Sequence, residues 1–123
     1  MLRSTIVLLL ALASPADATT LLTTGIDRSG SEYLECQALN AGKKAVDVTI
    51  EVRAVTTPPP DFVVCENETV SVPPGRISGV EAYASDCGAA GPYYAIFSFK
   101  GGKNAVRAWC WALENPALRS EAR

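Results

Sequence analysis

The chain of 123 residues is long enough for one domain, and its formal net charge is −2. The near balance of acids and bases gives no electrostatic signature of nucleic-acid binding and no polybasic patch for lipids. His is absent and no catalytic signature motif occurs, so we expect a protein that is not an enzyme and holds no cofactor or metal.

The first 18 residues have the three parts of a secretory signal. A basic start at Arg3 precedes an uncharged apolar stretch, Ser4–Ala13, and the segment ends in an Ala-x-Ala site at Ala18. The stretch is too short to cross a bilayer, which takes roughly 20 residues. We predict cleavage after Ala18, with Ala16 or Ala13 as lesser alternatives, and a secreted or periplasmic protein without a stable membrane span. A buried N-terminal helix or strand is the competing interpretation.

Four cysteines follow the signal, namely Cys36, Cys65, Cys87 and Cys110. An even number of Cys in a short exported chain predicts two disulfides. A metal site is not expected, because the closest Cys pair is 22 residues apart and His is absent.

Apolar and polar residues alternate with period two along the chain, which predicts strands. The clearest strand covers 45–55, and its apolar face holds Val46, Val48, Ile50 and Val52. A strand over 32–40 precedes it, with Leu34, Cys36 and Ala38 on one face. The Gly in the connection 41–43 favours a hairpin that brings Cys36 opposite Val48.

The middle of the chain is predicted to contain shorter strands and turns. The segment 56–61 carries three Pro residues, which a sheet interior excludes, and we expect it to cross to a second sheet. Short strands, or one broken strand, are expected at 62–65 and 68–72. The turn Val72–Gly75 leads to a weaker strand over 79–84.

The last predicted hairpin joins strands 93–100 and 105–113 through Gly101-Gly102. An even-length loop gives one inward face, made of Tyr93, Ala95, Phe97, Phe99, Val106, Ala108 and Cys110. The outer face then holds Tyr94, Ile96, Ser98, Arg107, Trp109 and Trp111. The polar residues 114–123 are expected to form a loose tail.

About seven short antiparallel strands predict a two-sheet, immunoglobulin-like sandwich over residues 19–113. Strands 32–40 and 105–113 both direct a Cys inward, so we favour the bridge Cys36–Cys110. The second bridge is then Cys65–Cys87. Four Cys allow three pairings, and the other two remain open.

One surface feature points to binding. The outer face of the last hairpin gathers Tyr94, Trp109 and Trp111 beside Arg107, residue types that dominate interface hot spots and stack on sugar rings. A covering strand or tail, or an inverted register, is the alternative explanation of these aromatic residues.

The segments Tyr33–Gly42, Val72–Gly75 and Ala105–Ala108, together with Tyr94, give the chain a family resemblance. It resembles short exported bacterial β-sandwich proteins with a Cys-x-x-x-Asn strand, a Pro-Gly turn and a late Val-Arg-Ala strand. The resemblance implies the fold and the compartment and transfers no active residues, because that group is functionally uncharacterised. The strand Trp109–Trp111 departs from the pattern and leaves any shared disulfide pairing open.

The leading functional hypothesis is a non-catalytic secreted or periplasmic module that binds a protein or a glycan. It would use the outer aromatic patch or the loops at the ends of the sandwich. The alternatives are a structural subunit of a surface fibre assembled by strand exchange, and a small hydrolase inhibitor. The inhibitor would present 72–76 or 85–92 as a rigid loop.

Overall fold

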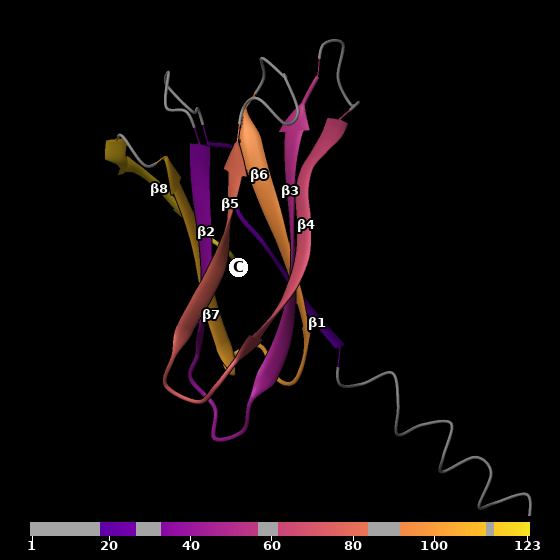
Figure 1. The fold of residues 1–123 in the computed structure, drawn as a ribbon, viewed down its shortest axis with the longest axis vertical. Coiled ribbons are helices and arrows are strands. Elements are labelled where there is room, and N and C mark those ends of the chain that lie inside the picture. Colours follow the sequence, from indigo (N-terminus) through magenta and orange to yellow (C-terminus); the bar gives the residue numbers. More distant parts are fainter. Residues whose placement is uncertain (1–17, 27–32, 57–61, 84–91, 113–114) are drawn as a thin grey trace, which may run out of the picture.

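The computed structural model describes residues 18–26, 33–56, 62–83, 92–112 and 115–123. Within these ranges eight antiparallel strands form two four-stranded sheets that pack face to face, and no helix occurs (Figure 1). The prediction of an all-β, two-sheet fold is confirmed. About seven strands were expected, and the described ranges contain eight, with four in each sheet.

The first sheet has the order β1-β6-β3-β4, and its strands are β1 (Ala18–Leu22), β6 (Tyr93–Lys100), β3 (Val46–Val55) and β4 (Phe62–Val72). The second sheet has the order β5-β2-β7-β8, and its strands are β5 (Ile77–Tyr83), β2 (Tyr33–Asn40), β7 (Val106–Ala112) and β8 (Asn115–Glu121).

The core lies between the sheets and takes every second side chain of the central strands. All seven residues predicted to point inward from 93–100 and 105–113 are at most 5% exposed. On β2 and β3 the predicted inward residues Leu34, Cys36, Ala38, Val48, Ile50 and Val52 are likewise buried, and Val46 is half-buried. Burial of these apolar side chains is the main stabilising contribution to such a fold.

Both predicted hairpins are wrong. β2 pairs with β5 and β7, whereas β3 pairs with β4 and β6, so β2 and β3 lie in opposite sheets. β6 and β7 are separated in the same way. Two strands of a hairpin and two strands that face each other across a sandwich bury the same alternate residues, and periodicity therefore cannot distinguish them. The connections after β2 and after β6 cross between the sheets.

The segment 56–61 does not lead to the second sheet as predicted, because β3 and β4 on either side of it are neighbours in the first sheet. Proline is excluded from a sheet interior but is tolerated at the end of a hairpin as well as in a crossing loop. The chain instead crosses between β4 and β5 through a tight turn. In this turn Gly75 has a φ of 72°, a conformation that favours Gly.

Of the two alternatives predicted for 62–72, the single interrupted strand is the one observed: β4 runs through the segment and contains a β-bulge. At the bulge Val52 pairs with Glu66 and Arg53 with Val64, so Cys65 is the extra residue of β4. Up to the bulge the inward residues are odd-numbered, with Cys65 buried, and beyond it the even-numbered Val72 is buried. An extra residue shifts the alternation by one position, and this shift made the strand look broken in the sequence.

The prediction of a loose tail over 114–123 is also wrong. β8 pairs along β7, with Glu121 opposite Trp109 and Arg119 opposite Trp111. Beyond β8, the backbones of Arg123 and Leu22 exchange two hydrogen bonds of 2.9 and 3.0 Å, which tie the second sheet to the end of β1. The C-terminal residues therefore complete the second sheet and close one side of the sandwich.

The disulfide Cys36–Cys110 is confirmed. The two residues lie directly opposite each other on β2 and β7, with 4.1 Å between their Cα atoms, and both are fully buried. Cys65 is also buried and disulfide-bonded. Its predicted partner Cys87 lies outside the described residues, as does the predicted signal segment before Ala18, so both remain predictions.

Candidate binding face on the second sheet

The structure divides the predicted aromatic patch between the two sheets. Trp109, Trp111 and Arg107 lie on the outer face of the second sheet, on β7. Tyr94 lies on β6 and therefore faces outward from the first sheet, on the opposite side of the sandwich. All four side chains do point outward, as predicted. They are divided because β6 and β7 lie in different sheets and do not form the predicted hairpin.

Two tyrosines that the sequence did not single out join the tryptophans. Tyr33 and Tyr83 are opposite each other on β2 and β5, and their ring centroids are 4.9 Å apart. Both point outward from the second sheet, as do Trp109 and Trp111 on β7, the other neighbour of β2. We call the four side chains the aromatic face. The alternation along β2 already places Tyr33 on the outer face. That Tyr83 lies beside it follows only from the pairing of β2 with β5.

Polar groups fill the space between the aromatic rings. Glu35 of β2 lies between Glu81 of β5 and Trp111 of β7 in the same row of the sheet. The amide of Gln37 donates a 2.9 Å hydrogen bond to Glu35, and the hydroxyl of Tyr83 donates a 2.6 Å hydrogen bond to Glu81. These bonds hold the carboxylates in place beside the rings and leave other lone pairs for a ligand.

Trp109 is partly enclosed by the neighbouring strand. The guanidinium of Arg119 on β8 lies 5.1 Å from the centroid of its ring, so β8 covers part of it. The indole N–H is buried and has no hydrogen-bond partner among the described residues. An unpaired buried donor costs free energy, and an N–H that is enclosed by the protein in this way is not open to a ligand.

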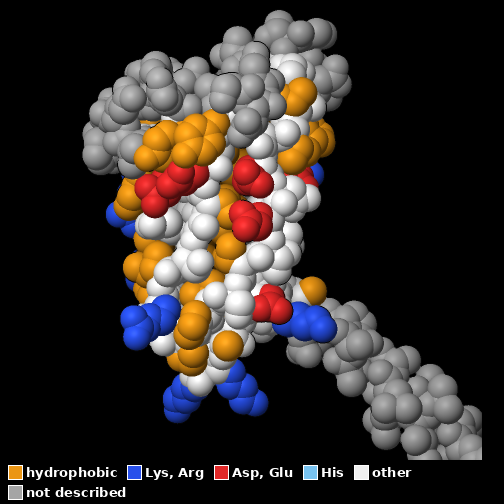
Figure 2. All heavy atoms as spheres, viewed as in Figure 1, with side chains coloured by type: hydrophobic (Ala, Val, Ile, Leu, Met, Phe, Trp, Pro, Cys, Tyr) orange, Lys and Arg blue, Asp and Glu red, His pale blue; other side chains and the backbone are white. Residues whose placement is uncertain are grey.

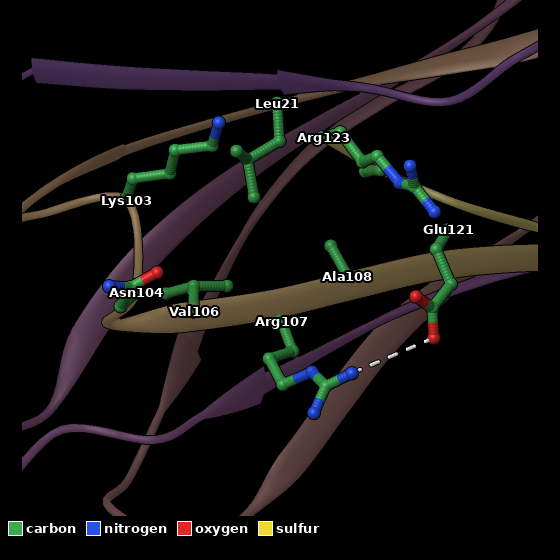
Figure 3. Close-up of a pocket in the computed structure, with 9 residues that line it drawn as sticks. Leu21, Lys103, Asn104, Val106, Arg107, Ala108, Glu121 and Arg123 are labelled. Carbon is green, nitrogen blue, oxygen red and sulfur yellow. Dashed lines mark ion pairs between the residues drawn. The ribbon is translucent and has the colours of Figure 1, made fainter.

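Arg107 and Arg119 share one carboxylate, since they lie 3.8 and 3.6 Å from Glu121, which offsets one of their two charges. Arg107 and Glu121 line the rim of a hollow of about 410 Å³ beside β1, where they point toward each other (Figure 3). Leu21, Val106 and Ala108 form the apolar floor of this hollow. The exposed Arg107 therefore belongs to this edge of the sheet more than to the aromatic face.

Tyr94 has a separate environment on the first sheet. Arg53 donates a hydrogen bond of 3.4 Å to its hydroxyl, forms an ion pair with Glu51 and lies 4.0 Å over the ring of Phe62. The hydrogen bond to Tyr94, followed by the contact with Glu51, raises the pKa of Arg53, while partial desolvation opposes the rise. Tyr94 is thus held by its own sheet and does not contribute to the aromatic face.

The described residues contain no group of three or more metal-ligating side chains. In the same ranges no helix has the length and hydrophobicity to span a membrane. Figure 2 shows that Asp and Glu side chains are concentrated in the upper part of the side it presents, whereas Lys and Arg side chains extend from the lower end.

The fold places the protein in the class of all-β sandwiches with a buried interstrand disulfide. No family model matches the chain, and no curated protein matches it. Among solved structures it is similar to the Anabaena sensory rhodopsin transducer, with 15% identity and a TM-score of 0.39. That match covers 75% of this chain and 90% of the other, and no function follows from so weak a likeness.

Proposed function

We propose that the protein is an exported, non-catalytic module that binds a glycan on the aromatic face. The observation that carries the proposal is that two Trp and two Tyr side chains point outward from the second sheet. Between them lie the carboxylates of Glu35 and Glu81 and the amide of Gln37.

A sugar offers both of the surfaces that this face complements. Its axial C–H groups form an apolar side that packs against an aromatic ring, and its hydroxyl groups donate to carboxylates at the ring edge. Along one strand, outward residues two apart are separated by roughly 6.6 Å, so Trp109 and Trp111 present two adjacent rings. Strands also hold these side chains more rigidly than loops would, which lowers the entropic cost of binding.

Export is part of the proposal and is supported by the signal-like segment and by the disulfide, which persists in oxidising compartments. β1 begins at Ala18, where cleavage is predicted. Removal of residues 1–18 would leave Thr19–Leu22 to pair with β6. We expect the protein in the periplasm or outside the cell.

The aromatic face predicts the effect of one matched pair of substitutions. Trp111→Ala should weaken binding to a glycan at least tenfold, because loss of a central aromatic contact costs about 1.4 kcal/mol or more. Tyr94→Ala removes an aromatic ring from the opposite sheet and should leave the affinity unchanged. The measurement is affinity electrophoresis and calorimetry with soluble chitohexaose, cellohexaose and peptidoglycan fragments.

Equal affinities of the two variants for a glycan that binds the unsubstituted protein would contradict the assignment of the face. Absence of binding to every glycan, together with capture of one defined protein that depends on Trp111, would assign the face to a protein partner and overturn the glycan proposal.

A further inference from the structure

One end of the sandwich is basic although the chain as a whole is acidic. The connection between β2 and β3 carries Lys43 and Lys44, the β4–β5 turn carries Arg76, and the end of β6 and its connection to β7 carry Lys100 and Lys103. All five side chains are exposed. We call this set the basic end; it is the lower end in Figures 1 and 2.

The basic residues here differ from those on the sheet faces. Arg53, Arg107 and Arg119 each form an ion pair with Glu51 or Glu121. Among the described residues no carboxylate pairs with any of the five cations of the basic end. Within these ranges no ion pair offsets their charges, which add to one positive field.

A buried asparagine fixes the three connections relative to one another. Asn40 is 1% exposed, and its side-chain amide donates to the carbonyl oxygens of Lys44 at 2.7 Å and Val72 at 2.8 Å. Its side-chain oxygen accepts from the N–H of Gly42 at 2.8 Å. The first and third of these bonds fold the β2–β3 connection, and the second joins that connection to the end of β4.

Backbone hydrogen bonds complete this assembly. Asn40 donates its N–H to Arg76 at 3.0 Å and accepts from Gly75 at 2.9 Å, which attaches the β4–β5 turn. Ala41 donates to Ala105 at 2.8 Å, which attaches the β6–β7 connection. The five cations thus stand on a preorganised base.

The lysines also surround a hollow. Lys43, Lys44 and Lys100 line a depression of about 430 Å³ whose other lining residues include Ala45, Val46 and Ala105. None of the described residues that line it is acidic. The arrangement places three ammonium groups around an apolar depression, with Arg76 and Lys103 on the neighbouring turns.

We propose that the basic end docks the protein end-on against an anionic phospholipid surface. Five cations spread over three turns match an array of phosphate groups better than a single small anion, which would contact at most a few of them. On the side that Figure 2 presents, most acidic side chains lie away from this end, so the charge asymmetry there also favours an end-on orientation. This surface is distinct from the aromatic face.

The test is cosedimentation of the purified full chain with vesicles. Vesicles of phosphatidylcholine containing phosphatidylglycerol should bind the protein at low salt, and binding should fall steeply toward roughly 1 M salt, where the screening length is about 3 Å. Vesicles of phosphatidylcholine alone should bind little, which also controls for insertion of the apolar N-terminal stretch.

Two matched variants locate the site. Lys43→Gln/Lys44→Gln should weaken binding to the anionic vesicles about 25-fold, since each cation near the surface contributes about fivefold. Arg107→Gln/Arg119→Gln removes the same formal charge from the sheet face, where Glu121 already offsets one of the two charges, and should retain most of the binding. Trp111→Ala should bind the vesicles normally, so that a failure of the glycan proposal is distinguishable from a failure of this one.

Equal losses in the two double variants would show that only total charge matters and would overturn the proposal. Absence of vesicle binding would do the same, including the case in which inorganic phosphate or a soluble polyanion binds the basic end instead.

Discussion

Replacement of both Cys36 and Cys110 by Ala should lower the free energy of unfolding by roughly 4 kcal/mol. The bridge closes a loop of 74 residues, and in the chain-entropy treatment a cross-link of this length removes entropy from the unfolded state and raises its free energy by about that much. A domain of this size has a net stability of only about 5–15 kcal/mol. The substituted protein should therefore unfold at much lower urea concentration, with a steeper dependence on urea because its unfolded chain is less compact.

Urea titrations of the oxidised protein and of the double variant provide the measurement. A loss below about 1 kcal/mol would mean that β2 and β7 are held together without the bridge, and that the cross-link has little influence on the unfolded ensemble. Intact-mass analysis before and after reduction should accompany the titration, because each bridge gains two hydrogens on reduction to thiols.

The second large effect is expected for Asn40→Ala, which should cost about 3 kcal/mol of stability. The substitution leaves two carbonyl oxygens and one N–H without the partner that the Asn40 side chain provides. Each such group that stays buried costs about 1–3 kcal/mol. Gln37→Ala is the matched control, because it removes an amide from the same strand on the outer face.

Thermal and urea unfolding of the two variants should separate them clearly. Similar stabilities would contradict the claim that the Asn40 side chain holds together the connections at this end of the sandwich. Loss of vesicle binding by Asn40→Ala at a temperature where the protein is still folded would further connect this side chain to the arrangement of the basic end.

The sequence predicts which side chains are buried but not which strands are neighbours. Alternation alone identified the inward faces of β2, β3, β6 and β7, because every second residue of a strand between two sheets must be apolar. Strand pairing depends on the path of the connections. Short glycine connections at 41–43 and at 101–102 suit a hairpin and also a crossing between sheets, and nothing local distinguishes the two.

The prediction of the candidate site is incomplete for the same reason, since it depends on which strands are neighbours. Trp109 and Trp111 were recognised by residue type, and their outward parity was right, but Tyr94 was placed with them because β6 and β7 were paired. Tyr83 could be added only when β5 was found beside β2. The basic end was missed because its five cations are distributed over three separate segments in a chain with a net charge of −2.

β8 was missed for a different reason. Its sequence is mostly polar and contains Pro116, a composition typical of loose tails. An edge strand tolerates Pro and charged residues because one side of it needs no partner, so composition is a poor guide there. The strand is identified by its pairing with β7 and not by its own pattern.

The central claim is that the outer face of the second sheet binds a glycan, and the two tryptophan indoles report on it most directly. The measurement is a ¹⁵N NMR titration with whichever hexasaccharide binds in the affinity experiment. We expect the indole N–H signals of Trp109 and Trp111 and the amide signals of β2 to shift together, while the signals of Arg53 and Tyr94 stay in place. Shifts at Arg53 and Tyr94 with both indole signals unchanged would contradict the account.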